Sequence, residues 1–205
     1  MKKLSVQISE AMVGESLANA RLALENVAKA HTVDLIRLAQ VVMAAMQSGR
    51  KLLIFGNGGS AADAQHVAAE FVNRFMINRP PLAAIALTTD SSILTSVGND
   101  FSFDDIFAKQ IRALGKPGDV ALGISTSGNS PNVIRAMEIA AELGLRTAIL
   151  TGGSGGKLKD MAEIVLCVPS AFTPHIQEAH LWLEHLLCRL VDEGLYGKAG
   201  FEAKE

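Results

Sequence analysis

Five short apolar segments, separated by helical patterns, constrain most strongly how this 205-residue chain can fold. They are KLLIF (51–55), AAIAL (83–87), DVALGI (119–124), RTAIL (146–150) and EIVLCV (163–168). Each is followed by Gly, Ser, Thr, Asp or Pro and then by apolar residues at helical spacing. Strands that are apolar without alternation are typical of parallel sheets buried on both faces. The pattern therefore predicts an α/β fold, a doubly wound parallel sheet of five strands with helices on both sides.

Helical patterns also flank this region of alternating segments. Residues 5–49 predict two helices with a break near Ala30–Thr32. The last predicted helix, roughly Pro174 to Glu193, is apolar over more than one stripe, which exceeds what a surface helix needs. We interpret these helices as buried between subunits. We expect one domain over 1–205, with 1–49 used in oligomerisation and 50–195 forming the α/β core.

Composition excludes several classes of function. The net charge is −2 and no cluster of Lys or Arg occurs, which argues against nucleic-acid binding. No apolar run reaches the ~18 residues of a membrane span, and the start of the chain lacks the apolar stretch of a signal peptide. Cys167 and Cys188 lie in apolar segments without CxxC spacing, so we expect both to be reduced core residues. These features predict a cytoplasmic protein without membrane or nucleic-acid partners.

Polar loops follow three of the predicted strands, where parallel sheets bind ligands. Gly56–Ser60 follows the first strand, and Ser125–Ser130 follows the third. Pro131 suits the first position of the next helix, with Ser130 as its cap. The loop after the second strand is long and ends in Val97–Asp100, whose polar groups can reach sugar hydroxyls. Backbone N–H groups and hydroxyls at helix N-termini favour anions, so we predict a phosphate site.

Other interpretations of these loops are weaker. Gly, Ser and Asn also form ordinary turns between strands and helices, but two such loops at strand ends favour a ligand site. The chain lacks the GK[ST] sequence of a P-loop nucleotide site. Gly56, Gly58 and Ala61 match a relaxed dinucleotide fingerprint, but Asp90 lies too far along to be its acidic partner.

His66 and Glu70 are four residues apart on a predicted helix, so they share a face, which we expect to lie near the Gly-rich loop. The alternative is an ordinary polar pair on a solvated face. The last helix carries further polar side chains, namely Gln177, His180, Glu184 and His185. HVAAE is not the HExxH pattern of zinc proteases, so spacing alone is weak evidence for a metal.

Four segments together resemble one known family: GNGGSAADAQHVAAE, SILTSVGND, GISTSGNSPNV and TPHIQEAHLWLEH. They are similar to the sedoheptulose-7-phosphate isomerases, or phosphoheptose isomerases, of the sugar-isomerase (SIS) superfamily. The resemblance covers nearly the whole chain. It implies a flavodoxin-like five-stranded sheet and a homotetramer with active sites between subunits. It also implies conversion of D-sedoheptulose 7-phosphate to D-glycero-D-manno-heptose 7-phosphate, the first step of ADP-heptose biosynthesis for lipopolysaccharide.

The same resemblance implies roles for individual residues. Glu70 and His185 match the catalytic carboxylate and imidazole of the family. The matching substrate-binding positions are Asn57, Gly58, Gly59, Glu70, Asn99, Asp100, Ser125, Thr126, Ser127, Ser130 and Gln177. One Zn²⁺ per subunit is implied, on His66, Glu70, Gln177 and His185. The chain departs from the family at His175, where an arginine commonly stands, and this bears on substrate contacts there.

Helix geometry adds an independent constraint on that zinc site. Gln177 and His185 are eight residues apart, or about 12 Å along an ideal helix. Metal bonds are about 2 Å long, so both side chains of one helix can barely reach a single ion. Spacing alone would rather pair His180 with Glu184. We therefore expect a site shared across a subunit interface.

The implied reaction passes through an enediol, with Glu70 moving the proton between carbons and His185 moving protons on oxygens. Zinc would polarise the carbonyl. One alternative is a non-catalytic SIS protein that binds the bacterial replication initiator, a branch lacking the equivalents of Glu70 and His185. Another is a module that senses sugar phosphates, which usually accompanies a DNA-binding domain that this sequence does not encode.

Overall fold

The five strands form one parallel sheet in the order β2-β1-β3-β4-β5. The structure is a computed structural model that describes residues 10–197. The strands are β1 (Leu52–Gly56), β2 (Ala84–Ala86), β3 (Val120–Ser125), β4 (Arg146–Gly152) and β5 (Ile164–Val168). Each lies within or beside a predicted apolar segment, and the order is that of flavodoxin-like folds. The predicted fold class is confirmed.

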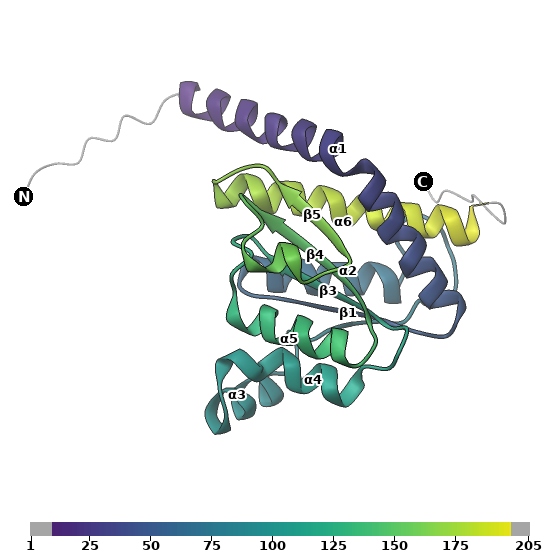
Figure 1. Cartoon of the computed structure of the whole chain (residues 1–205). Coiled ribbons are helices and arrows are strands. Elements are labelled where there is room, and N and C mark those ends of the chain that lie inside the picture. Colours follow the sequence, from purple (N-terminus) through teal and green to yellow (C-terminus); the bar gives the residue numbers. More distant parts are fainter. Residues whose placement is uncertain (1–9, 198–205) are drawn as a thin grey trace, which may run out of the picture.

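Helices cover both faces of the sheet (Figure 1). They are α1 (Glu10–Gln47), α2 (Gly59–Val72), α3 (Ser91–Asp100), α4 (Ile106–Leu114), α5 (Pro131–Glu142) and α6 (Thr173–Tyr196), with short 3₁₀ turns η1 (Phe103–Asp105) and η2 (Lys157–Asp160). Alternate residues of β1 face opposite layers: Leu52 and Ile54 pack with α1, α2 and α6, whereas Leu53 and Phe55 pack with α4 and α5. Burial on both faces explains why the strand sequences are apolar without alternation.

The predicted break near Ala30–Thr32 is confirmed at His31. Its φ of −126° and ψ of 16° interrupt the helical conformation of α1. The His31 ring bridges two elements, because Nδ1 lies 2.9 Å from Asp34 Oδ2 and Nε2 accepts a hydrogen bond from Cys167 N. The part of α1 after this break lies over the rest of the molecule (Figure 1), and the part before it still contributes Ala23 and Val27 to the core.

Helix α6 has apolar partners on two sides within the chain. One side packs on the sheet and α2, and Trp182, Leu186 and Leu190 lie with Leu35 of α1 around a small apolar hollow. The apolar excess of α6 is therefore satisfied largely by α1 of the same chain. The first half of α1, by contrast, exposes Met12, Val13, Leu17 and Leu22. No helix within residues 10–197 is both long and apolar enough to cross a membrane.

The two cysteines are free but differ in burial. Cys188 lies in the core as predicted. Cys167 is also free as predicted, but it is not a core residue, since its side chain is only half-buried and its Sγ donates to the carbonyl of Gly153. Cys167 belongs to β5, which is the edge strand of the sheet, and alternate residues of β5 are incompletely covered.

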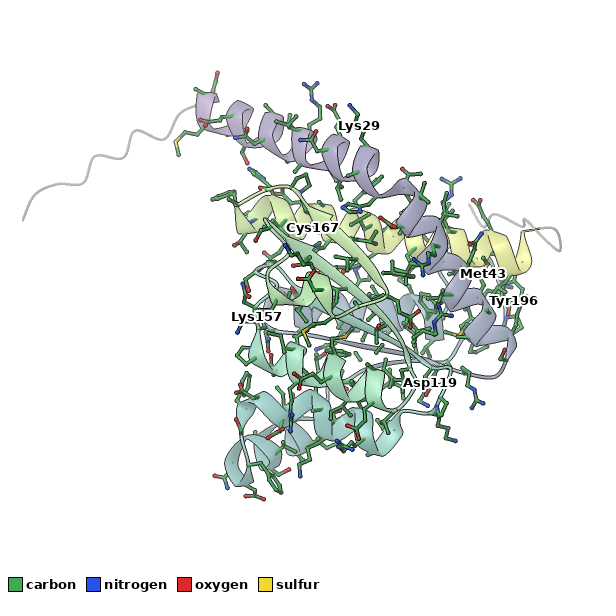
Figure 2. The ribbon with its side chains drawn as sticks, viewed as in Figure 1. Lys29, Met43, Asp119, Lys157, Cys167 and Tyr196 are labelled. Carbon is green, nitrogen blue, oxygen red and sulfur yellow. The ribbon has the colours of Figure 1, made fainter. Side chains whose placement is uncertain are left out.

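A buried carboxylate joins the beginnings of two strands. Asp119 is 1% exposed; its Oδ1 accepts from Lys51 N at 3.0 Å, and its Oδ2 accepts from Lys51 Nζ at 2.6 Å and Lys116 N at 2.8 Å. Figure 2 shows Asp119 at the end of the sheet opposite Lys157, which lies where the strands finish. The Asp119 contacts therefore stabilise the amino edge of the sheet, away from the ligand edge.

We predict that Asp119→Ala lowers the free energy of unfolding by roughly 3 kcal/mol, because the change leaves Lys51 and two backbone N–H groups without their acceptor. Glu142→Ala is the matched control, since Glu142 forms an exposed pair with Arg112 and its loss costs less than about 1 kcal/mol. Urea denaturation of both variants checks this. Equal losses would show that Asp119 adds no more than a surface pair.

Candidate functional site

The two predicted ligand loops lie side by side at the carboxyl edge of the sheet. Strands β1 and β3 are neighbours, with Gly56 paired to Ile124. The loops are joined by Asn57 and Asn132, whose side-chain amides donate to each other at 2.9 and 2.8 Å. Gly58 has a φ of +57° just before the first turn of α2, a conformation that favours glycine. This geometry brings the Gly-rich loop to the N-terminus of α5.

The segment Ser125–Ser130, called here the serine loop, is held by its own hydroxyls. Ser125 Oγ and Ser130 Oγ are 2.9 Å apart, and Ser127 Oγ accepts a hydrogen bond from Asn129 N at 3.2 Å. Ser130 occupies the N-cap position of α5 as predicted, but its hydroxyl forms no capping bond because it pairs with Ser125. Hydroxyls and free N–H groups at the start of a helix can bind an anion.

Gln177 of α6 lies at the same end of α2 as these loops. A Cβ placed on Gly59 would collide with the side-chain amide of Gln177. Glycine at position 59 therefore permits α6 to approach the first turn of α2 closely.

A second cluster of site residues combines two histidines, a glutamate and an aromatic ring. His66 Nε2 lies 3.1 Å from Glu70 Oε1, which confirms that the two side chains share a face of α2. The His185 ring meets the His66 ring edge-on, with centroids 5.0 Å apart. The Phe75 ring also stacks on the His185 ring, with an interplanar angle of 18° and centroids 5.6 Å apart. We call these four residues the His66–Glu70–His185 cluster with Phe75.

Within one chain, Glu70 of this cluster lies well beyond the Gly-rich loop along α2. Glu70 is 11 residues beyond Gly59, or about 16 Å along the helix. Helix α2 starts at the carboxyl edge of the sheet and runs back toward the other edge, since it connects two parallel strands. Within one chain, Gln177 and the serine loop therefore lie at one end of α2, and Glu70 with His185 lies toward the other.

Asn99 and Asp100 form a third location. We expected them in a loop, but they are the last two residues of α3. The helix forms because Asp90 caps it, with its side chain accepting from Ile93 N at 2.9 Å. Asn99 Nδ2 donates to Asp100 Oδ1 at 2.8 Å, and both residues are exposed.

The predicted zinc ligands are only partly gathered. His66, Glu70 and His185 supply two imidazoles and a carboxylate, a donor set that suits zinc. Gln177 lies at the Gly59 end. Among residues 10–197, no group of three or more His, Cys, Asp or Glu side chains is arranged to hold a metal ion. These side chains are therefore of the types that bind zinc, but residues 10–197 of one chain do not place them as a complete set of ligands.

Sequence reasoning missed Arg79 and Asp192, which form an ion pair with side chains 2% and 1% exposed. Arg79 Nε donates to Asp192 Oδ1 at 2.6 Å, and its Nη groups donate to the carbonyls of Phe71 and Glu70 at 2.8 and 2.9 Å. These carbonyls belong to the last turn of α2, so Arg79 satisfies the C-terminal end of the helix that carries Glu70. In the sequence, only the position of Asp192, an acid within a largely apolar helix, indicates a buried ion pair.

The same ion pair orders the segment after α2. Asp192 Oδ2 accepts from the backbone N–H groups of Met76 and Ile77 at 3.2 and 3.3 Å. Phe75 precedes these two residues, so Asp192 of α6 fixes the segment that places Phe75 on His185. The ion pair thus holds both the Glu70 helix and the ring that packs on the imidazole.

His180 and Glu184 face inward, away from a solvated surface. Both are at most 1% exposed. Burial lowers the pKa of His180 to about 4, opposed by the bond of its Nε2 to the Thr151 carbonyl at 3.0 Å. Burial, reinforced by Asp63, raises the pKa of Glu184 to about 8, and burial also raises the pKa of Asp63. The environment therefore favours the uncharged forms of His180 and Glu184.

The buried polar atoms of this region share a further feature. Within residues 10–197, five buried side-chain atoms lack a hydrogen-bond partner: Asp63 Oδ2, Thr151 Oγ1, His180 Nδ1 and both carboxyl oxygens of Glu184. His180 and Glu184, four residues apart on α6, thus share a buried polar group with Asp63 of α2 and Thr151 of β4, although no hydrogen bond joins the two side chains.

We predict that acid lowers the free energy of unfolding more in the wild-type protein than in the variant His180→Gln. The glutamine amide of this variant keeps a donor for the Thr151 carbonyl. Because the pKa of His180 falls from 6.5 to about 4 on folding, its contribution is full above pH 6.5 and is lost toward pH 4. Between pH 7 and pH 5 the wild type should lose about 2 kcal/mol relative to the variant. Urea denaturation at both pH values measures this difference.

The comparison with His180→Gln is needed because Glu184 acts in the opposite direction. Its raised pKa gives stability that is full below pH 4.5 and is lost as the pH rises toward 8. Glu184 and Asp63 are present in both proteins, so their contributions cancel in the difference. If the free energy of unfolding falls equally in the two proteins between pH 7 and pH 5, His180 is not held neutral in the folded protein and the prediction is wrong.

Comparisons with known proteins show to which family the chain belongs. Residues 17–152, about two thirds of the chain, match the model of the SIS domain family. Phosphoheptose isomerase of Nitratidesulfovibrio vulgaris (strain DSM 19637 / Miyazaki F) is 54% identical over 161 residues, covering 78% of this chain and 77% of the relative.

Two solved structures extend the likeness to three dimensions. Phosphoheptose isomerase from Neisseria gonorrhoeae superposes with a TM-score of 0.85 at 43% identity, covering 90% of this chain and 98% of that one. The enzyme from Francisella tularensis gives a TM-score of 0.87 at 39% identity, with 91% and 99% covered. The chain belongs to the phosphoheptose isomerase family of SIS-domain enzymes.

Proposed function

We propose that this isomerase converts D-sedoheptulose 7-phosphate to D-glycero-D-manno-heptose 7-phosphate. Membership of the phosphoheptose isomerase family supports the substrate. The observation that carries the proposal is the His66–Glu70–His185 cluster, in which a carboxylate and two imidazoles are in contact. Such groups can move protons near neutral pH, as a ketose–aldose conversion requires.

The serine loop is proposed to bind the phosphate of the substrate. Ser125, Thr126, Ser127 and Ser130 provide hydroxyls at the start of α5, where the helix favours negative charge. We propose that Asn57, Gly58, Gly59 and Gln177 line the adjoining pocket, and that Asn99 and Asp100 contact sugar hydroxyls. Phosphate binding would orient the sugar without taking part in its chemistry.

In the proposed reaction Glu70 removes a proton from C1 of the open-chain ketose and returns it to C2. His185 takes the proton from O1 and delivers it to O2, so the carbonyl moves from C2 to C1 with no net change in protons. His66 lies 3.1 Å from Glu70 and orients the carboxylate. Phe75 packs on His185 and restricts its ring.

One zinc ion per subunit is part of the proposal. His66, Glu70 and His185 would hold it, with Gln177 from a neighbouring subunit, because Gln177 and His185 are about 12 Å apart along α6. A bound zinc ion would polarise the substrate carbonyl.

We also propose a homotetramer with active sites between subunits. In one chain, a phosphate on the serine loop is separated from Glu70 by about the 16 Å that α2 spans between Gly59 and Glu70. A neighbouring subunit that supplies the cluster would remove this separation. The exposed apolar residues of α1, including Leu17 and Leu22, provide surface for such contacts. The proposed compartment is the cytoplasm, in keeping with a phosphorylated substrate whose charge opposes passage through a bilayer.

We predict that Glu70→Gln lowers kcat by about 10³-fold or more, since the amide cannot accept the C1 proton. The assay follows formation of the heptose phosphate, and size-exclusion chromatography reports whether the assembly is retained. Glu193→Gln is the control, because Glu193 forms an exposed pair with Arg189 on α6. A Glu70→Gln enzyme with normal turnover, or a wild type that binds a replication initiator without any turnover, would contradict the proposal.

We predict that Ser127→Ala raises KM for sedoheptulose 7-phosphate about tenfold, the effect of losing one hydrogen bond to a charged group. Steady-state kinetics give KM. Ser48→Ala serves as the control, because the Ser48 hydroxyl only caps the end of α1 through the Ala44 carbonyl. An unchanged KM in Ser127→Ala would remove that hydroxyl from the phosphate site.

A further inference from the structure

A second glycine-rich segment, Gly152–Lys157, follows strand β4 and packs against the serine loop. Strands β3 and β4 are neighbours, with Ser125 paired to Thr151, so the segments that follow them leave the sheet side by side. In Figure 2, Lys157 lies at this carboxyl edge. This segment, with the sequence GGSGGK, belongs neither to the serine loop nor to the His66–Glu70–His185 cluster. It has no role in the proposed reaction. We call residues 153–157 the support loop.

The contact between the two loops is made by backbone atoms. Gly128 of the serine loop has a φ of +64°, and a Cβ there would collide with the carbonyl of Gly155. Gly156 has a φ of +56°, and a Cβ there would lie 2.5 Å from the Gly128 oxygen and 2.6 Å from the Ser127 oxygen. Both positions therefore need glycine for conformation and for space. No side chain separates the loops, so a movement of one displaces the other.

Hydrogen bonds fix the two loops in register. The Gly128 carbonyl accepts from Leu158 N at 3.1 Å, and Asn129 Oδ1 accepts from Lys157 N at 3.1 Å. Asn129 also donates through Nδ2 to the Ser127 carbonyl at 2.9 Å. Residues 127–129 of the serine loop are thus bonded to the support loop and to the start of η2.

We infer that the support loop is the positioning element of the phosphate site, with Gly155 and Gly156 setting the place of the serine loop through its Gly128 backbone. The inference rests on the proposed binding of phosphate by the serine loop. Gly155 and Gly156 are positioning residues, because they act through the Ser127–Gly128 backbone. A phosphate site depends on donors held at fixed places, and a displacement of about 1 Å can cost a hundredfold in the function of such a site.

The test compares two glycine substitutions in the full-length protein. Gly156→Ala pushes on the Ser127 and Gly128 carbonyls, whereas Gly144→Ala imposes a similar strain at a φ of +73° but meets only an ordinary contact with Pro117 at 3.8 Å. Competitive inhibition by inorganic phosphate measures the phosphate site directly. We expect Gly156→Ala to weaken phosphate inhibition and to raise KM about tenfold. Gly144→Ala should leave both constants unchanged.

The separation of kcat from KM distinguishes positioning from general damage. Gly156 contacts the Ser127–Gly128 backbone and neither Glu70 nor His185, so Gly156→Ala should raise KM more than it lowers kcat. Asn129→Ala provides a milder variant that removes the bond from Lys157 N together with the bond to the Ser127 carbonyl, and it should weaken phosphate inhibition about threefold if these two bonds position the loop. It keeps the inference testable if Gly156→Ala fails to fold.

The outcomes separate this inference from the proposed function. If Ser127→Ala weakens phosphate inhibition but Gly156→Ala and Asn129→Ala do not, the support loop has no positioning role and the inference is overturned. If Gly156→Ala and Gly144→Ala weaken phosphate inhibition equally, backbone strain alone explains the effect and the inference is also overturned. If none of the variants, Ser127→Ala included, changes phosphate inhibition, the serine loop is not the phosphate site and the proposed function fails in that part.

Discussion

The packing of α2 along α6 determines where each reactive side chain of this protein can lie. At one end the lack of a side chain at Gly59 leaves room for the Gln177 amide. At the other end the buried ion pair of Arg79 and Asp192 joins the last turn of α2 to α6. Burying two charges is costly unless their remaining hydrogen-bonding groups are satisfied, and here backbone carbonyls and N–H groups satisfy them. The contact of His66 with His185 depends on this alignment.

The length of α2 then divides the proposed active site. The hydroxyls proposed to bind the phosphate lie at the carboxyl edge of the sheet, and the Glu70 carboxylate lies about 16 Å from Gly59 along the helix. Assembly of subunits offers a way to join the two parts, and it gives a physical reason for the apolar surface on the first half of α1. The buried polar group around His180 and Glu184 lies on the same helix pair, so it affects the stability of the arrangement that the site requires.

The sequence predicts features that repeat with a simple period, and it fails for features set by single contacts. The five strands, the break at His31 and the shared face of His66 and Glu70 follow from periodicity. The helical state of Asn99 and Asp100 depends on one cap by Asp90, and the exposure of Cys167 depends on β5 being an edge strand. Phe75 and Arg79 lie in an irregular segment whose shape comes from Asp192, which is distant in sequence, so no local pattern predicts their contacts.

Subunit complementation tests most directly whether the phosphate site and the Glu70 cluster of different chains form one active site. Glu70→Gln is mixed, under conditions that exchange subunits, with a variant carrying alanine at Ser125, Ser127 and Ser130. Isomerase activity should reappear in the hybrid assemblies, because an intact serine loop can meet an intact Glu70 from another chain. Hybrids that form yet stay as inactive as their parents would place both parts of the site within one chain and contradict the account.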